Sequence, residues 1–126
     1  MSGGAWEYVA AYVDNGNGNL TSYGKSLVNG DSKTKNVYSQ TGTDSNTNNY
    51  NTNKGVYGDA VYETSTSGSG TTSWYSDYSN FPNTNIPFFV RGGGYNDGSN
   101  AGVFYLGFSN GDGSSYHSFR PVLVAN

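Results

Sequence analysis

The sequence predicts a small, loop-rich domain of mixed α+β class, and three observations support this prediction. Gly and Tyr are abundant, with 19 and 12 residues among 126, and Ser and Asn add to a composition typical of β proteins with long turns. Three apolar and aromatic runs near the end of the chain are bounded by Gly, Asn or Asp, which predicts strands. The segment 56–64, "VYGDAVYET", has the apolar spacing of a short helix.

The composition limits the size of the core and the classes of partner. Hydrophobic residues, Tyr included, make up 33% of the chain, so few aliphatic side chains remain for a dry core. The net charge is −3 and the six Lys and Arg residues are scattered, whereas nucleic-acid binding needs a dense basic face. No apolar run has the length of a membrane span, and we expect no secretory signal peptide. The absence of Cys excludes disulfides and Cys-ligated metal centres.

The first half of the chain alternates between short apolar segments and polar turns. Residues 5–13, "AWEYVAAYV", fit the stripe of a helix and also the alternation of a strand, and the segment is too short to decide between them. The "DNGNGN" at 14–19 is a cluster of turn-forming residues. Residues 41–55 hold almost no apolar side chains, so we expect a long surface loop there.

An aromatic group lies in the segment 74–82, "WYSDYSNFP". Trp74 and Tyr78 are four residues apart, which suits one face of a short helix or a turn. We expect these rings to fill the core beneath a loop. Stacking on a ligand is the alternative.

The clearest strand signals lie in the segments 86–93, 101–108 and 118–124. The "NGDG" at 110–113 suits a tight hairpin turn between the last two, so we expect a mostly antiparallel sheet. Alternation along the strands will place some of the apolar residues outside. The predicted core residues are Trp6, Trp74, Phe88, Val90, Val103, Phe104, Phe119 and Val122.

The residue pattern gives little support for catalysis. His117 has no Cys or second His partner, and we interpret it as a solvated loop residue. The nine Asp and Glu residues are spread one at a time, whereas a glycosidase holds two carboxylates across its substrate. The "RGGG" at 91–94 lacks the Lys-Ser/Thr ending of a phosphate loop. We therefore expect no enzymatic activity. The alternative is a hydrolase whose carboxylates converge in one pocket.

Two stretches of the chain resemble a known family. "MSGGAWEYV", residues 1–9, resembles the "MSGNVWEWV" signature of the formylglycine-generating-enzyme (sulfatase-modifying factor) superfamily, and "VRGGGYNDGSNAGVF" with "SFRPVL" resembles its closing block. The resemblance implies a C-type-lectin-like fold, an irregular α+β domain with a small twisted antiparallel sheet. That fold also occurs in phage receptor-binding proteins and in the variable proteins of diversity-generating retroelements, the non-catalytic branch that this chain is most similar to.

Two features depart from the family pattern. The copper-binding Cys pair of the enzymes would fall near Asp97 and Gly102, and the chain has no Cys, so formylglycine chemistry is not implied. In the family, an N-terminal half of the domain precedes the position of Met1. We therefore expect residues 1–126 to form a single C-type-lectin-like domain that corresponds to the C-terminal part of a larger one.

The resemblance also implies a structural calcium site. Its ligands would be the carbonyls of Gly3 and Ala5 and the carboxylate of Glu7. The alternative for Glu7 is a carboxylate that accepts hydrogen bonds from nearby backbone N–H groups. No other cofactor is expected.

The polar field between the last strands resembles an antibody paratope, in which Tyr gives contact area and Ser, Gly and Asn give adaptable hydrogen bonds. The alternative is a set of polar turns with no partner. The candidate ligand-binding residues are Tyr95, Asn96, Asp97, Ser99, Asn100, Tyr105, Ser109, Asn110, Asp112, Ser114, Ser115, Tyr116 and His117.

These observations predict a non-enzymatic receptor-binding or ligand-binding domain. Its partner would be a host-surface protein or glycan, without nucleic acid and without membrane insertion, and its location would be extracellular, on a cell surface or a virion. The alternative is a structural subunit of an extracellular filament or pilus that self-associates through its strands.

Overall fold

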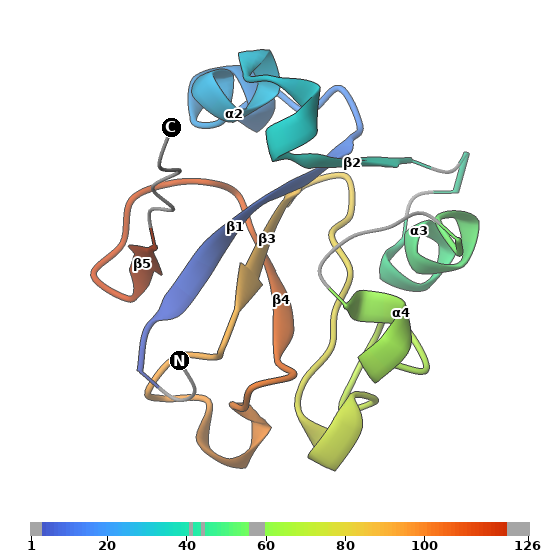
Figure 1. Ribbon diagram of the computed structural model, residues 1–126, viewed down its shortest axis with the longest axis vertical. Coiled ribbons are helices and arrows are strands. Elements are labelled where there is room, and N and C mark those ends of the chain that lie inside the picture. The colour runs from blue at the N-terminus through green and yellow to red at the C-terminus, as the bar shows by residue number, and fades with distance from the viewer. Residues whose placement is uncertain (1–3, 41, 44, 56–59, 121–126) are drawn as a thin grey trace.

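Residues 4–40, 42–43, 45–55 and 60–120 are described by the computed structural model, in which short helices surround one open sheet (Figure 1). The predicted α+β class is confirmed. Within these ranges the strands are β1 (Trp6–Asp14), β2 (Asn36–Ser39), β3 (Phe88–Arg91), β4 (Leu106–Ser109) and β5 (His117–Phe119). The α-helices are α1 (Asn19–Ser22), α2 (Lys25–Asn29), α3 (Asn46–Thr52) and α4 (Val61–Thr64), and the 3-10 helices are η1 (Ser32–Thr34), η2 (Trp74–Ser76) and η3 (Gly98–Asn100). None of the helices in the described ranges is long and apolar enough to cross a membrane.

β1 is the central strand of the sheet. The order across the sheet is β2–β1–β3–β4, and β5 also pairs with β1. The length of β1, nine residues, lets its first half pair with β5 and its second half with β2, both in parallel. On its other side β1 runs antiparallel to β3, with a register shift between Tyr8 and Tyr12. β3 and β4 are antiparallel, as the sequence predicts. The prediction of a mostly antiparallel sheet is wrong among the described residues, because β1 pairs in parallel with both β2 and β5 and the sheet is mixed.

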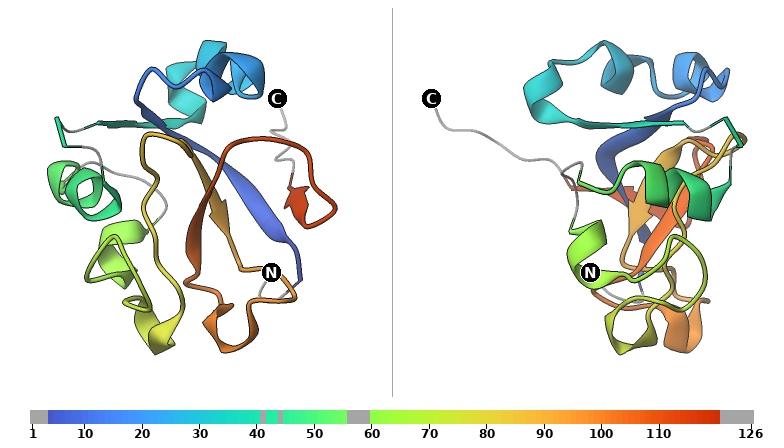
Figure 2. Two further views of the ribbon diagram at one scale, coloured as in Figure 1. Left: turned by 180° about the vertical axis from the view of Figure 1, so that it is seen from behind. Right: turned by 90° about the vertical axis from the view of Figure 1, so that its right-hand side faces the viewer.

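Strand alternation divides the core into two layers, one on each face of the sheet. Phe89 packs into the main cluster on one face, which α3 and α4 cover, and Phe88 packs on the other face against α1 and α2. Figure 2 shows the two helix pairs in separate places around the strands. The main cluster consists of Ala11, Val13, Tyr38, Tyr50, Val61, Phe81, Phe89 and Leu106.

Side-chain amides complete a core that is poor in aliphatic residues. Asn53 is buried and pairs with the backbone of Ser39, whose N–H donates to Oδ1 at 2.9 Å and whose carbonyl accepts from Nδ2 at 2.8 Å. Buried Asn49 donates from Nδ2 to the carbonyl of Pro82 at 3.0 Å. The Asn53 amide therefore occupies the place of a further strand beside β2 and attaches α3 to the sheet.

The segment 41–55 corrects the sequence prediction, because it contains α3 rather than only a loop. The Ser45 side chain accepts a hydrogen bond from the N–H of Asn48 and so caps the helix. The helix buries Asn49 and Tyr50 on one side. A search for apolar periodicity misses such a helix, because one of its two buried residues is polar Asn49.

The other segments agree with the prediction in part. The ambiguous segment 5–13 forms the strand β1, and α4 occupies the end of the segment 56–64, of which 56–59 lie outside the described residues. The predicted hairpin at "NGDG" is wrong, because β5 pairs in parallel with β1 and not with β4. The chain between β4 and β5 crosses β3 and β1 to reach the far side of β1.

The predicted core is confirmed for Phe88 and Val90, which are buried. Trp6 and Phe104 are half-buried. The prediction of burial is wrong for three residues that are exposed, Trp74, Val103 and Phe119. Val122 lies outside the described residues. Phe119 is exposed because β5 is a short strand with a neighbour on one side only among the described residues.

Phe89→Ala is expected to lower the free energy of unfolding by about 3–5 kcal/mol, because Phe89 is fully buried and its removal leaves a cavity in the main cluster. Phe119→Ala is the matched control, since that ring is 79% exposed. Urea denaturation followed by circular dichroism measures both. Equal destabilisation by the two substitutions would contradict the division of the core described above.

Candidate functional site

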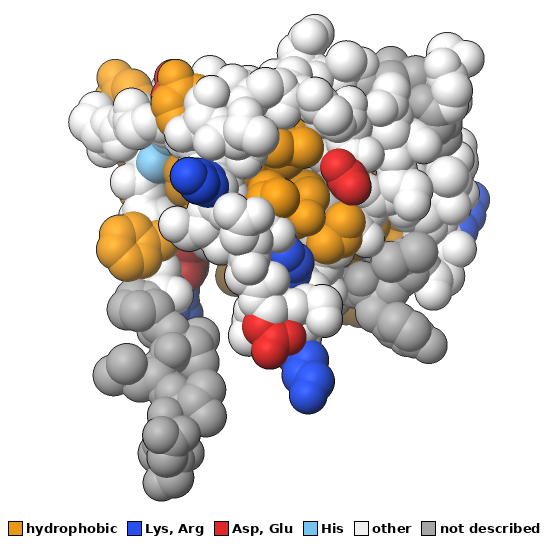
Figure 3. Space-filling model, turned by 90° about the horizontal axis from the view of Figure 1, so that it is seen from above, with side chains coloured by type: hydrophobic (Ala, Val, Ile, Leu, Met, Phe, Trp, Pro, Cys, Tyr) orange, Lys and Arg blue, Asp and Glu red, His pale blue; other side chains and the backbone are white. Residues whose placement is uncertain are grey.

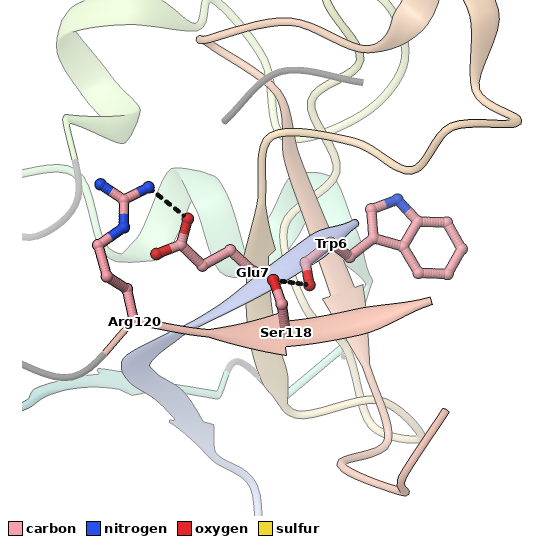
Figure 4. Close-up of polar contacts among 4 residues, drawn as sticks. All are labelled: Trp6, Glu7, Ser118 and Arg120. Atoms are coloured by element: carbon pink, nitrogen blue, oxygen red, sulfur yellow. Dashed lines mark hydrogen bonds and ion pairs between the residues drawn. The ribbon is translucent and has the colours of Figure 1, made fainter. Parts of the chain in front are cut away.

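The start of β1 brings together the two parts of the chain that carry the family resemblance. Glu7 lies between Arg91 of β3 and Ser118 of β5 in the register of the sheet. The N–H of Trp6 donates to the carbonyl of Tyr116 at 2.8 Å, and the hydroxyl of Ser118 donates to the carbonyl of Trp6 at 3.2 Å (Figure 4). Segments far apart in the sequence therefore meet around Trp6 and Glu7.

Glu7 forms an ion pair with Arg120, whose Nη2 lies 2.9 Å from the carboxylate Oε2 (Figure 4). The Arg120 side chain is mostly exposed, so the pair stabilises the fold by about 1 kcal/mol or less. Of the predicted calcium ligands, Gly3 lies outside the described residues, and the Glu7 carboxylate is paired with the Arg120 guanidinium. No group of three or more His, Cys, Asp and Glu residues gathers in the described part of the chain. The calcium site stays a prediction.

The "RGGG" segment is a turn that requires glycine at two positions. Gly92 and Gly93 have φ values of +84° and +73°, in the left-handed region that side chains rarely adopt. A Cβ on Gly93 would lie 2.7 Å from the Cβ of Ala101. At Gly94 a Cβ would lie 3.3 Å from the indole of Trp6, so the turn lies close against this side chain.

Asp97 fastens this turn to β1. Its Oδ2 accepts hydrogen bonds from the indole N–H of Trp6 and from the N–H of Gly94, each at 2.7 Å. The N–H of Tyr95 donates to the carbonyl of Gly4 at 2.9 Å. The carboxylate thus fixes the orientation of the Trp6 ring and the path of the chain that presents Tyr95.

Four rings form a continuous row at this place, which we call the aromatic row: Tyr95, Tyr116, Trp6 and His117. Successive ring centroids are 5.6 Å apart for Tyr95 and Tyr116, 6.5 Å for Tyr116 and Trp6, and 5.4 Å for Trp6 and His117. Tyr95 is 66% exposed and Tyr116 is 41% exposed. The outer end of the row therefore offers aromatic surface to a partner, while the inner end is packed against β1.

Tyr8 supports the inner end of the row. Its ring lies 4.9 Å from that of His117, and its hydroxyl lies 2.6 Å from Oγ of Ser109 and 3.2 Å from Nδ1 of His117. Burial raises the pKa of Tyr8, so its hydroxyl stays protonated in neutral solution. His117 is half-buried within β5, which corrects its interpretation as a solvated loop residue.

A pocket of about 240 Å³ adjoins the row, and we call it the Tyr105 pocket. Trp6, Tyr78, Asp97, Asn100, Tyr105 and Phe108 line it. The Tyr105 ring lies across β4 at Gly107, where a Cβ would come within 2.9 Å of the ring. Burial, and next the negative charge of Asp97, raise the pKa of Tyr105 above its ordinary value. Its hydroxyl is therefore protonated at any physiological pH.

Most of the candidate ligand-binding residues reach the surface, in whole or in part. Tyr95, Asn96, Ser99, Asn100, Asp112, Ser115 and Tyr116 are exposed, and Asp97, Asn110, Ser114 and His117 are half-exposed. Tyr105 and Ser109 are buried, which contradicts their predicted place on the exposed face. Tyr105 is folded back over Gly107, and Ser109 points from β4 toward the hydroxyl of Tyr8.

The candidates divide into two groups. Tyr95, Asp97, Tyr116 and His117 gather around Trp6, and Asn100 and Tyr105 join Asp97 in the pocket. The other candidates between β4 and β5 bond mainly within their own loop, where the side chain of Asn110 accepts a hydrogen bond from the N–H of Asp112 and the hydroxyl of Ser114 accepts one from the N–H of Tyr116. These loop residues fit the alternative of polar turns.

The sequence did not identify Trp6, Tyr8 and Tyr78 as site residues. A second exposed aromatic group lies in the segment 74–82, which was expected to fill the core with ligand stacking as the alternative. There Tyr75 is 87% exposed and stacks on Phe104 with an interplanar angle of 13°. Tyr75 and Ser76 both have φ near +60°, a strained conformation for residues other than Gly. Buried Asp77, which accepts a hydrogen bond from the N–H of Phe104, fixes this turn. This turn lies beside the Tyr105 pocket, because the next residue, Tyr78, lines the pocket and donates its N–H to the carbonyl of Asn100, which also lines it.

Figure 3 shows the face that lies at the top of Figure 1. This face is mostly polar and uncharged, with a few basic and acidic side chains around a patch of hydrophobic side chains. The lining of the Tyr105 pocket contains one formal charge, that of Asp97. Shape and hydrogen bonding therefore dominate over long-range attraction at this site.

No protein-family model, curated protein or solved structure matches the chain. The resemblance to the sulfatase-modifying-factor superfamily therefore stays a prediction.

The stability of the fold is expected to fall as the pH rises above about 10. An unfolded Tyr releases its proton there, whereas folded Tyr105 retains its proton because its pKa is raised, so the folded state binds more protons and loses stability with rising pH. Tyr105→Phe removes this contribution. The slope of the free energy of unfolding against pH, from urea titrations between about pH 8 and 11.5, should be smaller in the variant, by up to about 1.4 kcal/mol per pH unit. Identical slopes would contradict the burial of the Tyr105 hydroxyl beside Asp97.

Proposed function

We propose that this chain is a non-enzymatic recognition domain that binds a protein or glycan on a host-cell surface through the aromatic row. The observation that carries the proposal is the contact between two exposed rings, Tyr95 and Tyr116, that are held in place from behind by Trp6. Tyr gives a large contact area at a low entropic cost, which is the property that antibody paratopes exploit.

The surroundings of the row support a binding role. Short, uncharged side chains border it, and Asn96, Ser99, Asn100 and Ser115 are exposed there. Such side chains adapt their hydrogen bonds to a partner. The rings are fixed by Asp97 and by the pairing of β1 with β5, so little conformational freedom is lost when a partner binds.

The proposed fold is the C-type-lectin-like fold of the sulfatase-modifying-factor superfamily, in its non-catalytic branch. The α+β class supports this assignment, as does the contact between the two segments that carry the resemblance: the Trp6–Glu7 segment lies against Arg91 and Ser118. Phage receptor-binding proteins and retroelement variable proteins of this fold display variable surfaces. An extracellular or virion location is part of the same proposal.

The arrangement of acidic groups supports recognition over hydrolysis. The Tyr105 pocket holds one carboxylate, Asp97, and Oδ2 of this carboxylate accepts two hydrogen bonds from the chain itself. Glycoside hydrolysis with two carboxylates needs a second one about 5–10 Å away across the substrate.

One observation favours the alternative function of a filament subunit. β5 is an edge strand among the described residues, and Phe119 is exposed on it. Unpaired strand edges can pair with another chain. The strand is only three residues long, however, which limits such pairing.

The Tyr95→Ala/Tyr116→Ala double variant is expected to lose binding by about 30- to 1,000-fold, because each ring supplies roughly 1–2 kcal/mol of contact at the centre of an interface. Tyr105 is left unchanged, because its burial would confuse a loss of binding with a loss of fold. A cell-binding assay and a glycan array measure the affinity of the wild type and of the variant.

Tyr23→Ala is the control, since Tyr23 is exposed at the end of α1 and is not a member of the row. It should bind as the wild type does. A double variant that is folded and keeps wild-type binding would refute the proposal. A wild type that binds no cell and no glycan but forms fibres under the electron microscope would favour the filament subunit.

A further inference from the structure

The geometry points to the Tyr105 pocket as the site for one neutral sugar residue at the end of a surface glycan. This inference rests on the proposed function and names the class of ligand. The pocket shares Trp6 with the aromatic row, so a glycan that enters the pocket lies beside the row that ends in the exposed rings of Tyr95 and Tyr116.

The size of the pocket suits a single ring. Its volume, about 240 Å³, is below the range of roughly 300–1,000 Å³ that is typical for drug-sized ligands. An extended peptide or an oligosaccharide would therefore place one unit inside the pocket and the rest along the surface.

Aromatic side chains form much of the wall. Tyr78 and Tyr105 lie against each other with ring centroids 5.5 Å apart, and Trp6 and Phe108 complete the lining. The faces of aromatic rings carry negative charge in their π-systems, and the C–H bonds on one side of a sugar ring are weakly positive. A pyranose can therefore stack on such a wall while its hydroxyls point elsewhere.

The pocket also carries hydrogen-bond donors and acceptors side by side. Ionised Asp97 has about four acceptor positions, of which the N–H groups of Trp6 and Gly94 occupy two. Tyr105 keeps its hydroxyl proton because burial raises its pKa. Asn100 adds an exposed amide that both donates and accepts. Sugar hydroxyls also donate and accept, so they match this mixture.

Charge selects among the ligands that could fit. Asp97 is the one charged residue in the lining, and its negative charge disfavours acidic sugars such as sialic acid. A cationic ligand such as choline, which would bind against the aromatic rings, is the alternative to a neutral sugar. It would leave the amide N–H of Asn100 without a partner, and the charge of Asp97 is already partly compensated by the N–H groups of Trp6 and Gly94.

The test measures binding of single sugars by saturation-transfer NMR and by isothermal titration. The probes are glucose, galactose, mannose, fucose and N-acetylglucosamine, with sialic acid and choline as the charged competitors. At least one neutral sugar is expected to bind the wild type with a Kd near the millimolar range that is usual for one small ring. Tyr105→Phe should weaken it by about 3- to 10-fold, because one neutral hydrogen bond is lost. Asn100→Leu, which removes the amide and fills the opening, should weaken it at least as much.

Tyr75→Ala is the matched control, because it removes an exposed ring beside the pocket but outside its lining. It should bind the sugar as the wild type does, and circular dichroism shows whether each variant is folded. Binding of choline or sialic acid in preference to every neutral sugar overturns the inference, and so does the absence of binding by all five neutral sugars.

The two proposals fail in different ways. If no sugar binds but Tyr95→Ala/Tyr116→Ala abolishes cell binding, the pocket inference is wrong and the recognition function stands, with a protein as the partner. If a sugar binds and the pocket variants weaken it, but the double variant binds cells like the wild type, the pocket inference stands and the aromatic row is not the contact surface.

Discussion

The whole candidate site depends on two hydrogen bonds that Asp97 accepts, one from the Trp6 indole and one from the Gly94 N–H. They hold the glycine turn after β3 against the start of β1. The ring of Trp6 then contacts the turn at Gly94, where no side chain intervenes, and it belongs both to the aromatic row and to the lining of the Tyr105 pocket. Without this carboxylate the indole N–H and the turn would each lack a partner in a half-buried place.

The core of the fold is built with few aliphatic side chains. Tyr38, Phe81 and Phe89 meet at centroid distances of 5.0–5.2 Å, two of the three contacts edge to face, and so fill the main cluster with few aliphatic residues. Asn49 and Asn53 make directed bonds to backbone groups where other proteins would place aliphatic side chains. A chain with so many polar residues can therefore keep one conformation. The directed hydrogen bonds of buried amides specify it where a larger aliphatic core would otherwise do so by packing.

This way of folding explains why the loop-rich end of the molecule can serve recognition. The turns at 92–100 and 73–78 are bonded to strands and to each other through Asp97, Asp77 and the Tyr78–Asn100 pair. Their aromatic side chains are consequently held in place before any partner arrives. Preorganised rings with short polar neighbours bind with less loss of entropy than mobile loops would.

Local alternation and turn residues were enough to predict the α+β class, the strands β3 and β4, and the exposure of Tyr95 and Tyr116. The parallel pairing of β5 with β1, the burial of Tyr105 and the exposure of Trp74 could not be predicted from local patterns. It also brought Trp6 to Asp97, 91 residues away. Each of these depends on contacts between distant segments, and an aromatic or amide side chain suits the core and the surface equally until those contacts form.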